Sequence, residues 1–427
     1  MSSDRGETWA LDQLKGLKPV RFPPEWSEED RTVSGEFVVE AMVDGRWAET
    51  SQGFLLANAI LRTPVQRRYA EVGGELRFEH CVFKEGVALP YARFHRRVHF
   101  LGCTFRSSVD MSFCCGSELG FEELRSDRSA DSVPTVFWGN ASLVDSTIGG
   151  HLHLEKVEFR GEDNIANLRG IKVEGVAFFD GSSFEGRLDL SYCTFLQSLV
   201  LVGVRFLRFC DLSKTSVGAT LFVFAAPQQD GAWQTFDTQL PPEGDLRGLT
   251  YDRSDLGDDD RWRTWVDGMR RPGHFDADPY LTLERCFRRA GQDDLADNVH
   301  FKMRKDQGGH FWAQGRTYKW AINCLWRWSV GYGVKGWRLW GWAVPLPALL
   351  FVTLLIVCPW PHRSFDAVAA LVLYTLDVFL PLDLHQGDVC GQLYPGVRML
   401  KFVTELWGWL IVPAGLAQLA GLLKKAE

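Results

Sequence analysis

The chain has 427 residues, of which 46% are hydrophobic and 24% are charged, with a formal net charge of -7. This composition excludes a disordered or collagen-like chain, and the acidic balance argues against a general nucleic-acid binder. Ten cysteines in so long a chain do not indicate a disulfide scaffold. Residues 1–52 form an N-terminal segment, and its first 18 residues lack the apolar core of a secretory signal. We therefore expect residues 1–300 to lie in a reducing cytoplasm.

Residues 53–228 carry a repeat in which large apolar residues recur at alternating steps of five and six. The longest unbroken run is Leu168, Val173, Phe179, Phe184, Leu190, Phe195, Leu201, Phe206, Leu212, Val217 and Val223. A second, often small, apolar residue lies two positions before most of the large ones. A helix needs apolar residues three and four apart, and a hairpin strand needs longer alternation. A pair on each short face instead predicts a chain that turns a corner after each pair. Two steps of five and two of six then complete a coil of 22 residues.

The segment Ala166-Asn167-Leu168-Arg169-Gly170 and the similar Leu188-Asp189-Leu190-Ser191 carry a more specific signal. They resemble the consensus of the pentapeptide-repeat proteins: a small residue, Asp or Asn, Leu, then polar residues. The resemblance implies a right-handed quadrilateral β-helix over residues 53–228. Within it, the polar break in the register at residues 112–140 predicts loops that bulge from the solenoid. We expect Phe195 to lie in the core and Asp189 to point outward.

Cysteines and histidines inside the repeat are the next candidates. Four cysteines occupy the small inward position, which predicts buried structural thiols: Cys81, Cys103, Cys193 and Cys210. The histidines at positions 80, 99, 151 and 153 lack zinc spacing with the cysteines, so no metal site and no cofactor is predicted. His151 and His153 should share one face, at the surface or at a corner. Phosphate-loop, dinucleotide and triad motifs are absent, so we expect no enzyme.

Two connecting segments follow the repeat. Residues 229–276 are rich in acids and predict a solvated linker; the alternative, a calcium loop at Asp258–Asp260, lacks the alternating oxygen ligands. Residues 277–306 have the apolar spacing of two amphipathic helices broken at Gly291 and look like a tetratricopeptide-type helical hairpin. A single pair cannot stack into a solenoid, so an adaptor between domains is expected.

Basic residues and tryptophans gather in residues 307–340, which predicts an interfacial helix on anionic lipid. Nucleic-acid binding is the rival interpretation, but the adjoining apolar run favours the bilayer as partner. The expected interface residues are Trp326, Trp328, Trp337, Arg338, Trp340 and Trp360.

The last part, residues 341–427, is predicted to be an α-helical membrane domain. Two long apolar runs predict spans at 341–360 and 402–423, and the shorter run at 366–388, which ends in polar residues, predicts a re-entrant segment. The excess of Lys and Arg before the first span and after the second places both termini and the solenoid in the cytoplasm. The expected localisation is the plasma (inner) membrane.

This order of helix, re-entrant segment and helix resembles the two-helix pore module of the potassium-channel superfamily, and the chain as a whole resembles bacterial membrane pentapeptide-repeat proteins. The resemblance implies a homotetramer that conducts inorganic cations, although the TVGYG filter sequence is absent. Candidate residues lining the pore are Asp377, Asp383, His385, Asp388 and Glu405.

The sequence thus favours a multimeric cation channel whose cytoplasmic β-solenoid senses or gates. The alternative is a membrane-tethered scaffold or binding module without conduction, with an unknown protein or ligand on the solenoid. The third hypothesis is an enzyme whose active site lies where the repeat is interrupted, but no catalytic sequence motif supports it.

Overall fold

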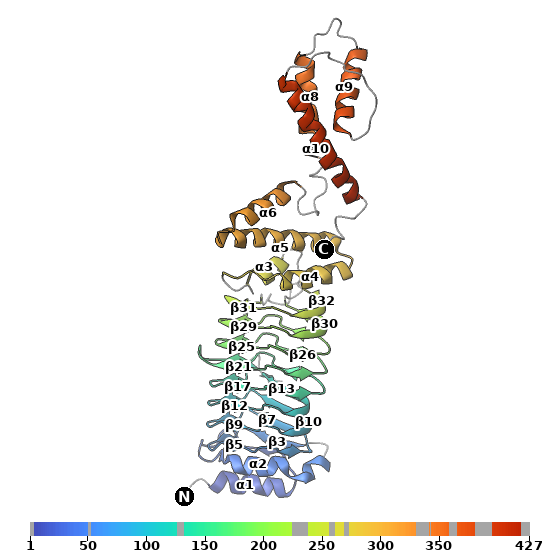
Figure 1. Cartoon of the computed structure of the whole chain (residues 1–427). Helices are drawn as coiled ribbons and strands as arrows, with labels where there is room; N and C mark the ends of the chain where they lie inside the picture. The colour runs from blue at the N-terminus through green and yellow to red at the C-terminus, as the bar shows by residue number, and fades with distance from the viewer. Residues whose placement is uncertain are drawn as a thin grey trace. The chain divides into compact units, whose positions relative to one another are not determined.

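The structure is a computed structural model that describes residues 4–49, 53–125, 132–223, 238–255, 261–268, 273–329, 341, 343–357, 365–380 and 395–419. Two compact units divide the chain, residues 1–296 and residues 297–427. The first unit is a β-solenoid of about seven turns, as the repeat predicted (Figure 1).

Each coil of the solenoid has four faces, numbered here in chain order. Face 2 is an eight-stranded parallel sheet of β2 (Thr32–Val33), β4 (Ile60–Leu61), β8 (Val82–Phe83), β11 (Thr104–Phe105), β16 (Val136–Phe137), β20 (Glu158–Phe159), β24 (Ser183–Phe184) and β28 (Arg205–Phe206). Face 3 is a second such sheet of β5 (Val65–Gln66), β9 (Val87–Ala88), β12 (Val109–Asp110), β17 (Ala141–Ser142), β21 (Ile165–Asn167), β25 (Arg187–Asp189), β29 (Phe209–Asp211) and β31 (Glu243–Asp245).

Faces 1 and 4 share one 14-stranded sheet, because four long strands run around the corner between them: β10 (Arg93–Leu101), β13 (Cys115–Glu122), β30 (Ser216–Phe222) and β32 (Thr250–Asp255). The other strands of face 1 are β1 (Val20–Arg21), β3 (Phe54–Ala57), β7 (Leu76–Glu79), β19 (Leu152–His153), β23 (Ala177–Phe178) and β27 (Leu199–Val200). Those of face 4 are β6 (Glu71–Val72), β18 (Thr147–Ile148), β22 (Lys172–Val173) and β26 (Thr194–Phe195).

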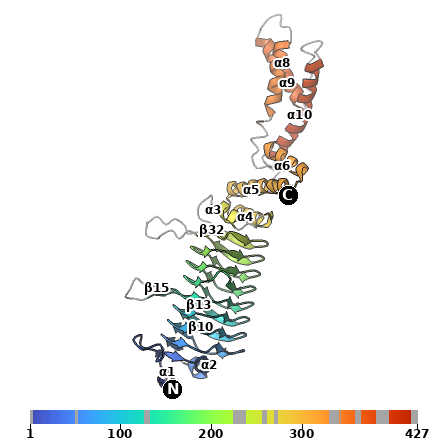
Figure 2. The same ribbon diagram turned by 90° about the vertical axis from the view of Figure 1, so that its left-hand side faces the viewer.

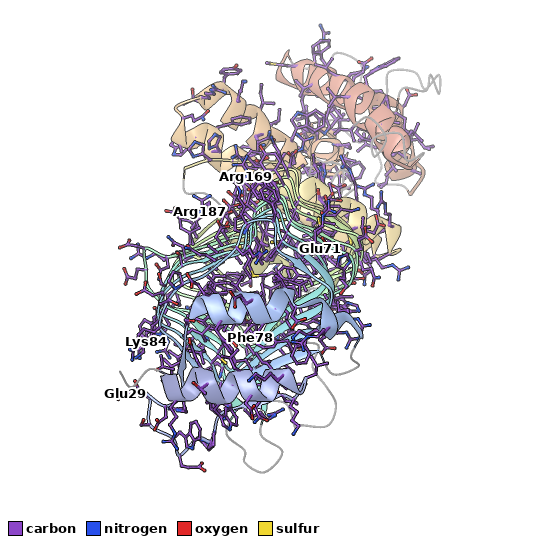
Figure 3. The ribbon with its side chains drawn as sticks, turned by 90° about the horizontal axis from the view of Figure 1, so that it is seen from below. Glu29, Glu71, Phe78, Lys84, Arg169 and Arg187 are labelled. Carbon is purple, nitrogen blue, oxygen red and sulfur yellow. The ribbon has the colours of Figure 1, made fainter. Side chains whose placement is uncertain are left out.

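The core is built from columns of identical positions in successive coils. On face 2, Phe83, Phe105 and Phe137 are in register, and their ring centroids are 4.7 Å apart at each step. Phe195, predicted to lie in the core, is 0% exposed. Figure 3 looks along the stack and shows Phe78 inside the strands, while Lys84 and Arg187 lie outside them. Parallel coils in register bury one continuous apolar interior.

The Asp or Asn of the repeat holds the corner after face 3. One carboxylate or amide oxygen accepts a hydrogen bond from the backbone N–H two residues later in five coils, at Asp110, Asn167, Asp189, Asp211 and Asp245. Such a bond satisfies an amide at the point where the chain turns away from the sheet. The preference for these residues in the repeat therefore has a local structural cause.

Replacing Asp189 by alanine is expected to lower the free energy of unfolding by about 1 kcal/mol, because the corner loses a hydrogen bond. Asp189 Oδ1 accepts bonds from the backbone N of Ser191 at 3.0 Å and from its Oγ at 2.6 Å. This cost exceeds the one expected of a freely outward-pointing side chain. Urea denaturation followed by circular dichroism measures it, with Asp189→Asn as the control that keeps one acceptor; an alanine variant as stable as the wild type would contradict the role.

The solenoid is longer than residues 53–228. It begins with β1 and β2 in the N-terminal segment, where α1 (Asp4–Lys15), α2 (Gly35–Val43) and the 3-10 helix η1 (Gly45–Glu49) also lie. The predicted acidic linker at 229–276 is corrected in part, because it contributes β31, β32 and α3 (Arg261–Gly268). Leu246 and Leu249 are each 3% exposed there and continue the apolar core beyond the predicted end of the repeat.

A loop was predicted at residues 112–140, and the described residues bear this out in part. Long strand β13 occupies the first portion, whereas β14 (Leu124–Arg125) and β15 (Ser132–Val133) form a small antiparallel pair off the main sheets. Figure 2 shows β15 projecting to one side of the stack.

Helices make up the rest of the chain. Two helices cover the hairpin predicted at 277–306: α4 (Asp278–Arg289) and α5 (Asp293–Ala313), with Gly291 between them at a φ of +73°. They are followed by α6 (Thr317–Ser329), α8 (Pro345–Val357), α9 (Phe365–Phe379) and α10 (Pro395–Leu419). Side chains of α8, α9 and α10 pack together around Leu354, Leu371 and Val397.

The prediction of two membrane spans, and with it of a plasma-membrane protein, is wrong for the part of the chain that is described. None of its helices combines the length and the apolar character that crossing a membrane requires. Helix α8 has 13 residues, or about 20 Å at the α-helical rise, against a hydrocarbon core of about 30 Å. Helix α10 has 25 residues but carries Arg398, Lys401 and Glu405 in its first half. Of the predicted re-entrant segment at 366–388, residues 366–379 belong to helix α9, and residues 381–388 lie outside the described residues.

Candidate functional site

Two histidines and three glutamates come together on the outside of face 1. This histidine–glutamate cluster comprises His99, Glu118, Glu122, His153 and Glu155. Its side chains are 16–38% exposed, so they lie in the surface but are only partly open to solvent. Titratable groups that are partly buried and paired with one another are typical of functional sites, which makes the cluster the first candidate.

The parallel register brings these residues together. His99 lies on β10, Gly120 on β13 and His153 on β19, and they are paired rung by rung in one outward column. Gly120 separates the two imidazole rings, whose centroids are 6.4 Å apart. A Cβ atom at Gly120 would lie 2.5 Å from Glu122 Oε1 and 2.8 Å from His99 Nδ1. The missing side chain thus leaves the space into which this carboxylate and this ring reach.

Hydrogen bonds and charge pairs link the members. Glu122 Oε1 is 3.0 Å from His99 Nδ1, and Glu155 Oε2 is 3.0 Å from His153 Nδ1. Glu118 Oε1 lies between the two rings, 3.4 Å from His99 Nε2 and 3.8 Å from His153 Nε2. The three carboxylates therefore share two imidazoles.

The ionisation of the cluster follows from these contacts. Burial opposes charge on Glu122, but the hydrogen bond and the charge of His99 outweigh it, so the pKa of Glu122 is lowered. Burial also opposes charge on His153, but its hydrogen bond to Glu155 and the nearby carboxylates outweigh it, so the pKa of His153 is raised. Burial, with the negative charge of Glu155, raises the pKa of Asp180 to about 6. Negative charge is thus concentrated at this part of face 1.

The sequence predicted that His151 and His153 share a face, but it did not predict the cluster. His151 Nδ1 accepts a hydrogen bond from the backbone N of Val176 at 3.0 Å, and its ring centroid is 5.9 Å from that of His153. The sequence analysis missed that His99 and His153 lie on either side of Gly120 in the parallel sheet.

A second surface feature is a column of aromatic rings at the corner between faces 3 and 4. This aromatic column comprises Tyr69, Tyr91 and Phe113, with ring centroids 5.1 and 4.8 Å apart. Tyr69 is 66% exposed and Phe113 43% exposed. The guanidinium of Arg68 lies 5.4 Å from the first ring and 5.0 Å from the second. All three aromatic residues have the left-handed backbone conformation, with φ between 58° and 61°.

The cysteines predicted to be structural are buried. Cys81, Cys103 and Cys210 are 0% exposed and Cys193 1% exposed. Burial raises the pKa of the Cys193 thiol to about 12, and Cys114 behaves in the same way. Thiols with so high a pKa stay protonated, which excludes these two as nucleophiles at neutral pH.

The pore-lining candidates are only partly covered by the described residues. Asp377 lies half-buried in the last turn of α9, and Glu405 is exposed on α10. Asp383, His385 and Asp388 lie outside the described residues. The conduction of cations and the tetramer stay untested predictions.

Of the predicted interface residues, Trp326 is 53% exposed on α6. Trp328 belongs to the same helix, but its side chain is outside the described part, as are Trp337, Arg338, Trp340 and Trp360 altogether. Their assignment to a lipid surface stays a prediction.

Fold and site together define a β-solenoid protein with polar and aromatic clusters on its outer surface. No protein-family model, curated protein or solved structure matches the chain.

Proposed function

We propose that this chain is a binding module: a β-solenoid of the pentapeptide-repeat type that holds an acidic protein partner against the aromatic column. The carrying observation is the stack of three rings at successive left-handed corners, of which Tyr69 and Phe113 are exposed and Tyr91 is half-buried. Cation conduction stays a prediction and is not part of this proposal.

The backbone conformation of the aromatic column costs folding free energy, so stability alone does not explain why these residues are aromatic. A bulky side chain with positive φ is strained, whereas Gly and Asn adopt this conformation readily. Three other coils have Asp145, Gly170 or Gly248 at the same corner, whereas two have the larger Tyr192 and Lys214. Stacking of the rings offsets part of that strain, but the rings lie at the surface rather than in the core, with Tyr69 66% exposed and Phe113 43% exposed. Exposed aromatic side chains on a rigid support are the residues that dominate protein interfaces.

Charge near the column supports an acidic partner. Exposed Arg67, Arg68 and Arg93 lie beside Tyr69 and Tyr91 in sequence, on a chain whose net charge is -7. Basic and aromatic residues together also suit nucleic acid, but there each base needs an open ring face. Here the rings cover one another, with an interplanar angle of 5° between Tyr91 and Phe113. The exposed ring edges and the guanidinium groups suit carboxylate and aliphatic side chains better.

Substitution by asparagine separates binding from folding. We expect the double variant Tyr69→Asn/Tyr91→Asn to fold with unchanged or higher stability, because Asn tolerates positive φ. Its affinity for the partner should fall by at least ~10-fold, since two anchor rings are lost. The partner is first identified by cross-linking in cells that express the full chain, then purified and titrated with each variant by calorimetry.

Tyr192→Asn is the matched control, because Tyr192 is at the same corner with φ 60° and 48% exposed, but outside the aromatic column. It should bind as the wild type does. The proposal is wrong if the double variant binds the partner with wild-type affinity. A partner that proves to be nucleic acid would also overturn it.

A further inference from the structure

The histidine–glutamate cluster plays no part in the proposed binding of a protein partner, yet its geometry is that of a ligand set. Glu122, His153 and Glu155 each offer one ligand atom, and these three atoms lie within 4.8 Å of one another. A metal ion lies about 2.0–2.2 Å from each of its ligand atoms. Small rotations of these side chains would bring the three ligand atoms close enough to bind the same ion. We propose that these three residues bind one divalent transition-metal ion.

The fold places two of the ligands on strands, Glu122 on β13 and His153 on β19, and the third, Glu155, in the turn just after β19. The pairing of Gly120 with His153 places Glu122, two residues further on β13, beside Glu155, two residues further along the next coil. Adjacent parallel strands are about 4.8 Å apart, which suits side chains that converge on one ion. All three ligands therefore come from two neighbouring coils, Glu122 and His153 from paired strands and Glu155 from the turn that follows.

Two neighbours support the site from outside the ligand set. Gly120 leaves open the space beside the Glu122 carboxylate, since an added Cβ would lie only 2.5 Å from Glu122 Oε1. His99 Nδ1, at 3.0 Å, binds Glu122 Oε1 and fixes the orientation of this carboxylate. Partners that orient ligating carboxylates in this way commonly change metal affinity about 10–100-fold when removed.

Charge balance also favours a cation. Glu118, Glu122 and Glu155 are concentrated here with Asp180, whose Oδ1 has no hydrogen-bond partner among the described residues. Arg97 neutralises part of this charge by pairing with Glu118 at 3.3 Å. A divalent ion would relieve the remaining repulsion between carboxylates.

The donor atoms indicate the class of metal. One imidazole nitrogen with two carboxylate oxygens suits Zn²⁺, Co²⁺ or Mn²⁺, whereas Ca²⁺ requires about six to eight oxygen ligands. The site should therefore prefer Zn²⁺ strongly over Ca²⁺.

Zn²⁺ titrated into the chelator-treated full chain, with calorimetric detection, tests the site. We expect one equivalent to bind, and affinity to fall at least ~10-fold in His153→Asn and in Glu155→Gln, each of which loses a ligand. The matched control is His95→Asn: His95 Nε2 pairs with Glu71 Oε1 at 3.1 Å, but both are more than half exposed and no second carboxylate completes a ligand set there among the described residues. Circular dichroism verifies the fold, and Glu155, which is 38% exposed, tolerates substitution even if His153 does not.

Co²⁺ distinguishes this site from the cysteines, because exposed Cys115 could also bind zinc. Oxygen and nitrogen ligands give weak visible bands without the near-ultraviolet charge-transfer band of a thiolate. Three results would each overturn the proposal: no stoichiometric uptake of Zn²⁺ by the wild type, wild-type affinity in both ligand variants, or a thiolate band in the Co²⁺ spectrum.

Discussion

Replacement of Phe105 by alanine should lower the free energy of unfolding of the solenoid by about 3–5 kcal/mol, the largest effect expected of a single truncation in this chain. The ring is 1% exposed and stacks between Phe83 and Phe137 at 4.7 Å on each side. Its removal leaves a cavity between coils whose backbone hydrogen bonds fix their spacing, so the gap cannot close. Urea denaturation followed by far-ultraviolet circular dichroism measures the change.

Leu207→Ala is the control on the same face. Leu207 follows β28 directly and is 44% exposed. Its truncation should change stability by no more than about 0.5 kcal/mol. Similar losses in the two variants would mean that the inward and outward columns of face 2 are wrongly assigned.

Replacement of Gly186 by alanine is expected to cost about 1–3 kcal/mol, because a side chain there forces two coils apart. An added Cβ would lie 2.0 Å from the backbone oxygen of Asn164 and 2.9 Å from that of Gly161. Backbone atoms cannot rotate away as a flexible side chain does, so the coils themselves must shift. Thermal unfolding of the two proteins at equal concentration gives the difference.

Gly116→Ala makes the same chemical change where there is room. The nearest atom to an added Cβ is Phe94 Cβ at 3.7 Å, an ordinary contact. Stability should be unchanged or higher by about 0.4–1 kcal/mol, since alanine has less freedom to lose on folding. If Gly116→Ala were as damaging as Gly186→Ala, the spacing between coils could not be the cause.

The solenoid could be predicted because its signal is local and repeated. Each coil packs against coils like itself, so equivalent positions need the same type of residue. Phe184, Phe195 and Phe206 therefore each indicate, independently, a position that points into the core. The last coil was not predicted, because Asp245 and its acidic neighbours resemble a solvated linker in composition. Only pairing with β29 reveals that Asp245 occupies the corner position of the repeat.

The histidine–glutamate cluster could not be predicted for a different reason. His99 and His153 are 54 residues apart in the sequence. In the fold they are two coils apart, because the residues around β14 and β15 form an insertion outside the regular coils. Neither residue type nor spacing in the sequence shows how long that excursion is. The register between β13 and β19 had to be known first.

The helical unit shows the limit of composition as a guide. In α8, Leu350 and Leu354 are 0% exposed and pack against α9 and α10, whereas the other face of the helix exposes large apolar side chains: Leu349, Val352, Leu355 and Ile356. Gly408 allows α10 to approach α9 closely, since a Cβ there would lie 1.7 Å from the Phe379 oxygen. Apolar content alone does not distinguish packing against protein from packing against lipid.

Open ends are the weakness of any stack of parallel coils. The first coil would present unpaired backbone N–H and C=O groups along its outer edge, and a second molecule can continue the ladder from there. Helices α1 and α2 contact the first strands of the stack and cover that end (Figure 1). Helix α2 also buries apolar side chains, among them Val38 and Met42, at 0% and 1% exposed. A covered edge disfavours the addition of a further coil from a second molecule.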